Sequence, residues 1–179
     1  VASRGLGDVY KRQAQEAVRW TEQAASAGAQ CVMLLPPNAY RADERTVIEH
    51  YRMVAKTGVP IIAYNNPYDT KVDLTPHLLG RLHAEGLIVG VKEFSGDARR
   101  AYEIAEQAPG LDLLIGSDDV LVELAIAGAV GWVAGYPNAF PVTCVELYEL
   151  ALDKNLDKAL PLYRMLHPLL RWDCLLYTS

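Results

Sequence analysis

The sequence contains few cysteines, and none of them lies at the spacing of a metal site or a CxxC pair. The three cysteines, Cys31, Cys144 and Cys174, are widely separated in a chain of 179 residues. Disulfide frameworks and structural zinc sites need closely spaced cysteines or histidines. We therefore expect reduced, buried cysteines in a cytoplasmic protein, and no bound metal.

Long apolar runs and clusters of basic residues are also missing. No apolar stretch approaches the roughly 20 residues that a membrane-spanning helix needs. The net charge is −5, and the densest basic pair, Arg99-Arg100, is predicted to lie on a helix surface. Partners such as nucleic acid and anionic membranes require clustered positive charge. The composition thus indicates one globular domain with neither nucleic acid nor membrane as its partner.

The two ends of the chain differ from the rest. Residues 1–13, VASRGLGDVYKRQ, show no amphipathic period, and residues 174–179, CLLYTS, interrupt an amphipathic helix without a cap. Both segments resemble translated linker or sequencing-adapter sequence, and a genuine disordered terminus is the alternative. We predict a non-native leader over 1–13, a non-native tail over 174–179, and an internal fragment of a longer domain over 14–173.

Between these ends, strand-like and helix-like segments alternate. Apolar runs predict strands over residues 31–35, 59–65, 87–92, 111–116 and 130–135. Amphipathic periods and capping residues predict helices over 14–27, 42–57, 75–84, 97–108, 118–128, 141–152 and from 155 onward. This order predicts a parallel sheet covered by helices, with strands buried on both faces.

Polar residues follow most of the predicted strands, which favours a barrel over a doubly wound sheet. They are Asn38, Tyr64-Asn65-Asn66, Lys92-Glu93, Ser117-Asp118 and Gly135-Tyr136. In a (β/α)8 barrel every strand end contributes to one site, whereas a doubly wound sheet concentrates function at one switch point. No glycine-rich phosphate motif follows any strand. We predict an α/β fold, a partial TIM (β/α)8 barrel containing about strands 4–8 with their helices.

Lys92 ends the apolar run in IVGVKEFSGD and is the first candidate for catalysis. A lysine has a pKa of about 10.4 in water, and burial favours its neutral amine, which can form a Schiff base with a ketone. The alternative is a lysine that extends to solvent. Tyr64 ends the preceding strand, where its phenol can relay protons or simply cap the core.

The other ionisable candidates have structural explanations. Glu93 should point away from Lys92, because side chains alternate along a strand, and should bond between sheet and helices. Asp118 and Asp119 begin a helix, where carboxylates cap the dipole. The four histidines, His50, His77, His83 and His167, show no HxH or HExxH spacing, which disfavours a metal-dependent aldolase.

The segments IIAYNNP, IVGVKEFSGD, LLIGSDD and GWVAGYPNAFP together resemble the dihydrodipicolinate synthase/N-acetylneuraminate lyase family of class I, Schiff-base aldolases. The resemblance runs over residues 14–173. It implies that Lys92 is the nucleophile toward pyruvate or a related 2-keto acid, and that Tyr64 is the proton relay. It places Gly116 and Val133 near the substrate. It also implies no cofactor and a homotetrameric parent enzyme.

The sequence departs from the family pattern in three places. The early strand that carries the family's glycine-threonine-threonine-glycine-glutamate motif has no counterpart. Asp69, in NNPYDT, stands where synthases that condense aspartate semialdehyde have an arginine. Asn38 and Ala39 match the position of a synthase tyrosine used across a subunit interface, and Tyr40 lies one residue out of register.

These departures change the expected reaction. Asp69 and Asn38 are predicted to line the substrate site. The parent is predicted to be an aldolase or dehydratase acting on a hydroxylated 2-keto acid, such as a keto-deoxy sugar acid. The fragment itself is expected to be inactive. A non-catalytic, regulatory member that binds a keto acid is the alternative.

Overall fold

A five-stranded parallel sheet forms the centre of the computed structural model, which describes residues 2–39 and 41–172. The strands are β1 (Val32–Leu34), β2 (Ile61–Asn65), β3 (Gly90–Glu93), β4 (Asp112–Ile115) and β5 (Gly131–Trp132). Each strand pairs with the next one along the chain, so the order is β1-β2-β3-β4-β5. A doubly wound sheet would reverse its strand order at a switch point. The observed order instead matches the predicted segment of a barrel wall.

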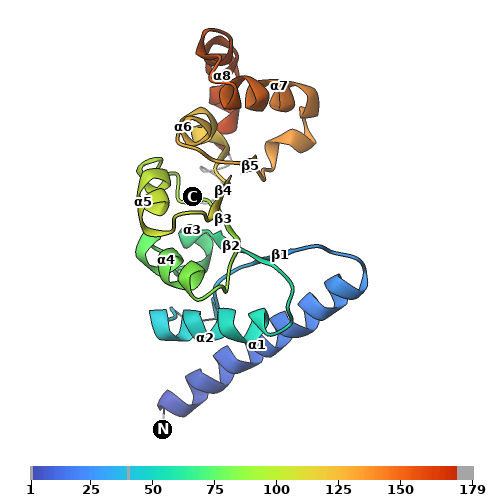
Figure 1. Cartoon of the computed structure of the whole chain (residues 1–179), viewed down its shortest axis with the longest axis vertical. Coiled ribbons are helices and arrows are strands. Elements are labelled where there is room, and N and C mark those ends of the chain that lie inside the picture. The colour runs from blue at the N-terminus through green and yellow to red at the C-terminus, as the bar shows by residue number, and fades with distance from the viewer. Residues whose placement is uncertain (1, 40, 173–179) are drawn as a thin grey trace.

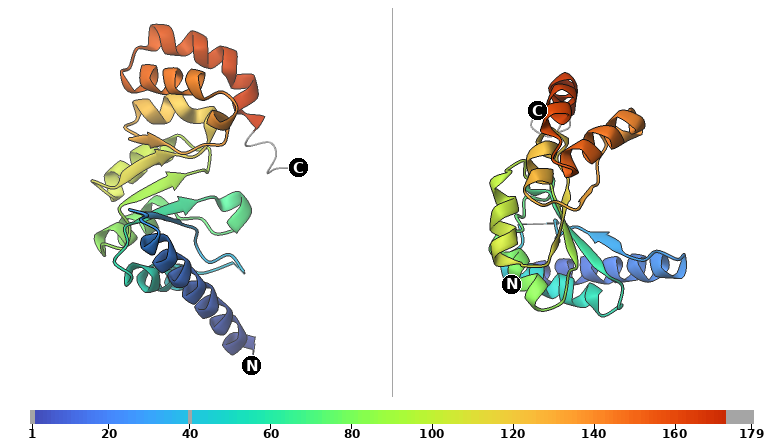
Figure 2. Two further views of the ribbon diagram at one scale, coloured as in Figure 1. Left: turned by 90° about the vertical axis from the view of Figure 1, so that its right-hand side faces the viewer. Right: turned by 45° about the horizontal axis from the view of Figure 1, so that its top comes forward.

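Helices follow the strands in the predicted alternation. They are α1 (Ala2–Ser26), α2 (Glu44–Ala55), α3 (Pro67–Thr70), α4 (Pro76–Ala84), α5 (Arg99–Gln107), η1 (Asp118–Val120), α6 (Leu121–Ile126), η2 (Tyr136–Asn138), α7 (Pro141–Leu152) and α8 (Leu156–Leu170). The elements follow one another around an open arc, with α1 at one end and α7 and α8 at the other (Figures 1 and 2). In the described part of the chain, no helix has the length and apolarity needed to cross a membrane.

Helices α2 and α4 begin at capping residues that the sequence offers. The Asp43 carboxylate accepts a hydrogen bond of 2.8 Å from the Thr46 backbone N–H at the start of α2. Thr75 caps α4, and Pro76 occupies its first turn, where a missing N–H costs nothing. The sequence did not predict α3, because its four residues are too short to show a helical period.

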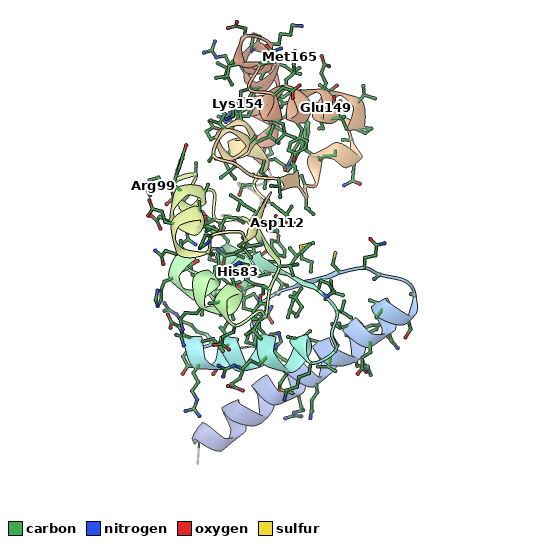
Figure 3. All side chains as sticks on the ribbon, in the orientation of Figure 1. His83, Arg99, Asp112, Glu149, Lys154 and Met165 are labelled. Atoms are coloured by element: carbon green, nitrogen blue, oxygen red, sulfur yellow. The ribbon has the colours of Figure 1, made fainter. Side chains whose placement is uncertain are left out.

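The main core lies between the sheet and the helices that cover one of its faces. We call this the outer face and define it by Ile61, Ala63, Val91, Leu113 and Ile115, which are all buried. Buried side chains of the covering helices pack against it, among them Val47, Tyr51, Leu79, Leu82, Ile104, Leu121 and Leu124. His83 and Arg99 mark α4 and α5 on this side of the sheet (Figure 3). Removing these apolar groups from water supplies most of the favourable free energy of folding.

The prediction that the strands are buried on both faces is wrong for the opposite face. We call this the inner face and define it by Met33, Ile62, Tyr64, Lys92, Leu114 and Val133. Met33 is 47% exposed and Val133 36% exposed, and the other four are partly buried. Side chains alternate between the faces of a strand, and the helices within residues 2–39 and 41–172 pack mainly against the outer face. The inner face is therefore open along the arc.

The structure also bears on the predictions for the cysteines and for the two ends of the chain. Cys31 is exposed just before β1, so the expectation of a buried thiol is wrong there, whereas Cys144 is buried. Cys174 and the tail 174–179 lie outside the described residues. Helix α1 begins at Ala2 rather than at residue 14, because a formed helix propagates at little cost. The assignment of residues 1–13 as a non-native leader stays a prediction.

Candidate active site

Lys92 and Tyr64 lie side by side on the inner face. Strands β2 and β3 pair in parallel with Tyr64 opposite Lys92, so both side chains leave the sheet in the same direction. The Lys92 Nζ atom lies 4.1 Å from the centroid of the Tyr64 ring. Such a distance gives a favourable contact between an ammonium group and the ring face. The structure thus brings together the two residues predicted to be catalytic.

Aromatic rings surround the Lys92 amine. The centroid of the Phe94 ring is 5.8 Å from Lys92 Nζ, and this ring meets the Tyr64 ring edge to face at 6.4 Å. Phe94 is only 3% exposed. The amine thus lies beside two aromatic rings at the end of β3.

Glu93 points away from Lys92 into the layer between sheet and helices, as predicted. Its side chain is 1% exposed and accepts hydrogen bonds from the Ser95 backbone N–H at 2.7 Å and from Asn65 Nδ2 at 3.0 Å. Burial raises the pKa of Glu93, and these hydrogen bonds oppose the rise. The hydrogen bond to Asn65 joins the end of β3 to the end of β2, on the face of the sheet opposite the Tyr64–Lys92 pair.

Arg100 extends this buried network to α5. Its guanidinium group makes two hydrogen bonds to Asp73, of 2.7 and 2.6 Å, and lies 3.9 Å from Glu93. The hydrogen bonds from Arg100 hold the pKa of Asp73 below its ordinary value. Asn65 completes the network by donating to Asp73 at 3.3 Å. Arg100 was expected on a helix surface, and instead it joins three segments behind the site.

A second set of hydrogen bonds starts at the Tyr64 hydroxyl. Asn66 Nδ2 donates to Tyr64 Oη at 3.3 Å and to Asp69 Oδ2 at 2.7 Å. The Asp69 backbone N–H donates to Asn66 Oδ1 at 3.3 Å. Asn66 is 3% exposed, whereas Asp69 is exposed. The structure therefore links Asp69, predicted to bind substrate, to the predicted proton relay through Asn66, for which the sequence predicted no contact.

Gly116 directly follows β4 and packs against the backbone at the end of β3, next to the candidate nucleophile. Its backbone N–H donates to the Glu93 carbonyl at 2.9 Å. A Cβ atom at position 116 would stand 2.5 Å from that carbonyl oxygen, so only glycine fits without moving the strand. Val133 is one strand further along, and its backbone N–H donates to the Ile115 carbonyl at 3.0 Å.

Asn38 is not brought into contact with these residues. It follows β1, two strands away from β3, and its exposed side chain accepts a hydrogen bond of 3.1 Å from Gln13 on α1. A second hydrogen bond, of 3.4 Å, joins the Ala39 backbone N–H to the Gln13 side chain. These contacts of the 38–39 segment hold it against α1, away from the Tyr64–Lys92 pair.

Asp118 has a different role from the expected helix cap. Its carboxylate is 1% exposed and accepts hydrogen bonds from Trp132 Nε1 at 3.0 Å and from the Tyr136 backbone N–H at 3.2 Å. It therefore links the turn after β4 to the segment after β5. The sequence could not indicate this link, because both partners lie more than a dozen residues downstream.

No three metal-ligating side chains (His, Cys, Asp or Glu) lie close enough together to hold an ion within residues 2–39 and 41–172. The buried histidine, His50, lies on α2 in the helix layer. The side chains that the structure brings together on the inner face are the amine of Lys92 and the phenol of Tyr64.

Comparison with known proteins shows which family this chain resembles in sequence. A sequence model of the dihydrodipicolinate synthetase family matches residues 7–177. The 4-hydroxy-tetrahydrodipicolinate synthase of Methanothrix thermoacetophila is 36% identical over 159 residues, which are 87% of this chain and 54% of that protein. The chain thus spans about half the length of the curated relatives that it matches.

Solved structures match over the same region. A putative dihydrodipicolinate synthetase from Pseudomonas aeruginosa is 35% identical with a TM-score of 0.81, covering 86% of this chain and 54% of that one. The chloride-inhibited dihydrodipicolinate synthase from Acinetobacter baumannii, solved in complex with pyruvate, is 28% identical with a TM-score of 0.83, covering 88% and 55%. The chain therefore belongs to the dihydrodipicolinate synthetase family, and its five strands are part of that family's TIM barrel.

Proposed function

We propose that the parent enzyme of this chain is a lyase that forms a Schiff base between Lys92 and the carbonyl carbon of pyruvate or a hydroxylated 2-keto acid. The observation that carries the proposal is the Lys92 amine, 4.1 Å from the centroid of the Tyr64 ring on the open inner face. Membership in a family whose named relatives are synthases supports it.

In the proposed reaction the neutral Lys92 amine attacks the ketone carbon of the substrate. The resulting carbinolamine loses water to give a protonated imine, which in an aldolase accepts the electron pair of a breaking C–C bond. In a dehydratase the protonated imine accepts the pair of a breaking C–H bond, and the enamine formed then expels the neighbouring hydroxyl group, which leaves as water after protonation. The Tyr64 phenol carries protons to and from the reacting atoms. These steps use only side chains of the protein and need neither a cofactor nor a metal.

The proposed substrate class rests on Asp69. It stands where synthases that use aspartate semialdehyde have an arginine, and a carboxylate repels a second carboxylate while accepting hydrogen bonds from hydroxyl groups. We therefore favour an aldolase or dehydratase acting on a keto-deoxy sugar acid over the synthase reaction named for the relatives. Gly116 and Val133 are proposed to line the substrate site beside Lys92, and Asn38 its periphery, two strands away from β3.

Reductive trapping on the full-length parent tests the nucleophile. The protein is mixed with pyruvate or with each of a panel of 2-keto acids, treated with borohydride and digested, and the peptide containing Lys92 is examined by mass spectrometry. We expect an adduct on Lys92 and none in a Lys92→Met variant. Binding without any adduct across the panel would replace the lyase with a regulatory keto-acid-binding protein.

The isolated chain is proposed to have little or no turnover, because the residues that hold the substrate carboxylate in this family lie on an early strand that has no counterpart here. The parent is proposed to be a homotetramer, which light scattering on the full-length protein would test. Turnover by the 179-residue chain alone would contradict the first of these two proposals.

A further inference from the structure

The loop after β2 contains an asparagine that contacts the predicted proton relay. Asn66 is 3% exposed and caps the short helix α3, where its side chain accepts from the Asp69 backbone N–H. Its own carbonyl accepts a hydrogen bond of 2.8 Å from the buried Thr70 hydroxyl. Pro67 follows it and restricts the backbone at this position. Asn66 is therefore held in place at both its backbone and its side chain.

The orientation of the Asn66 amide is determined by Asp69. An ionised carboxylate can only accept hydrogen bonds, so the group 2.7 Å from Asp69 Oδ2 must be the NH2 end of the amide. The carbonyl end faces the Asp69 backbone N–H, which can only donate. Both ends of the amide thus contact residue 69. In the reversed orientation the amide oxygen would face the Asp69 carboxylate, acceptor against acceptor, and the NH2 group would face the Asp69 backbone N–H, donor against donor.

This orientation determines how the Tyr64 hydroxyl bonds to the loop. The NH2 group has two hydrogens, and one of them points to Asp69. The other is directed at Tyr64 Oη, 3.3 Å from the nitrogen. The phenol oxygen is therefore an acceptor toward Asn66, and the phenolic hydrogen is directed elsewhere.

We infer that Asn66, oriented by Asp69, is a positioning residue that directs the phenolic hydrogen of Tyr64 toward the reacting atoms on Lys92. This inference rests on the proposed function. In the dehydration of the carbinolamine, Tyr64 gives its proton to the departing hydroxyl group, and water leaves. The nitrogen lone pair forms the C=N bond, and the positive charge of the iminium balances the negative charge of the phenolate. The Asn66 N–H stabilises that phenolate while it exists.

The first test measures the hydrogen bond without any reaction. The chain is prepared with tyrosine labelled with carbon-13 at Cζ, the Tyr64 signal is identified by its loss in Tyr64→Phe, and the signal is followed by NMR as the pH rises. Asn66→Ala removes the donor but keeps Asp69 and Lys92. We expect the Tyr64 titration midpoint to move upward by about one pH unit, because a donor to the charged form is lost.

Matched variants separate this effect from a general loss of structure. Asn138→Ala removes another asparagine, whose amide donates to the Gly135 carbonyl within its own exposed turn, and should leave the Tyr64 signal unchanged. Asp69→Asn keeps the size of an exposed side chain but lets the Asn66 amide adopt the reversed orientation. It should raise the Tyr64 titration midpoint by less than Asn66→Ala does. If Asn66→Ala fails to fold, Asp69→Asn decides the question. An unchanged Tyr64 titration in the folded variants would overturn the inference.

The second test measures the chemistry in the full-length parent. Asn66→Ala should lower kcat by about 10- to 100-fold and leave KM for the keto acid unchanged, since only proton transfer is affected. If the unaltered parent forms no adduct at Lys92, the proposed function fails while the NMR result still stands. If the adduct forms at the same rate in Asn66→Ala although the titration has moved, the positioning role is wrong.

Discussion

The two faces of the sheet differ in what they contribute to this protein. On the outer face, Ile61, Val91 and Ile115 are at most 1% exposed under a layer of helices. On the inner face, Met33 remains 47% exposed, and the Lys92–Tyr64 pair stands in the open arc. Packing that stabilises the fold is thus concentrated on one face and the chemistry on the other.

The largest expected difference between the faces is in the cost of removing an apolar side chain. Ile115→Ala, on the outer face, should lower the free energy of unfolding by about 2–5 kcal/mol, because it leaves a cavity in a closed core. Met33→Ala, on the inner face, should change it by no more than about 0.5 kcal/mol. Urea denaturation of both variants measures the two values. Equal costs would mean that the inner face is covered in solution.

The helix layer should also make the protein sensitive to acid through His50. This side chain is 6% exposed, and desolvation lowers its pKa to about 4. An unfolded histidine titrates near pH 6.5, so between about pH 6.5 and 4 the unfolded state binds more protons, and stability falls as the pH falls.

Replacing this histidine tests the effect. His50→Leu should remove an acid-induced loss of about 3 kcal/mol over that window, read from thermal or urea unfolding at a series of pH values. His77→Leu, which changes an exposed histidine on α4, should keep the pH dependence of the unaltered chain. The interpretation fails if the two variants respond alike.

A smaller loss of stability is expected at Gly116, where the backbone after β4 packs closely against the end of β3. Gly116→Ala places a methyl group 2.5 Å from the Glu93 carbonyl oxygen and should cost about 1–3 kcal/mol, since backbone must move. The same change at Gly135 meets no atom within 4 Å and should be nearly neutral. In the full-length parent, Gly116→Ala should also slow trapping at Lys92, because the end of β3 is displaced. Comparable stabilities of the two variants would contradict the close approach of β3 and β4.

The smallest change in stability is expected for a polar substitution on the inner face. Met33→Gln should alter the free energy of unfolding by less than about 0.5 kcal/mol. It should nevertheless reduce self-association of the chain in light scattering, because open apolar faces and unpaired strand edges promote aggregation. Val142→Gln, 80% exposed on α7, is the control that removes an apolar group from a helix instead. If the helix variant reduces association more, the inner face is not the main contact.

Much of the inner-face site could be predicted because parallel pairing converts sequence position into spatial position. Tyr64 and Lys92 each end an apolar run, and the parallel register then places one opposite the other. Glu93 on the outer side follows from the same alternation. The contacts of Arg100 with Asp73, and of Asp118 with Trp132, could not be predicted, because 27 and 14 residues separate the partners.

The sequence by itself determined the alternation of strands and helices, the parallel order of the sheet and the strand ends that carry an amine and a phenol. Local periodicity, capping residues and side-chain alternation decide these features over a few residues at a time. Only the tertiary structure decided which face of the sheet is closed, that Cys31 is exposed, and that Asp69 orients Asn66 toward Tyr64. These depend on how distant segments pack and on which atoms can donate or accept a hydrogen bond across a loop, and no local pattern specifies that.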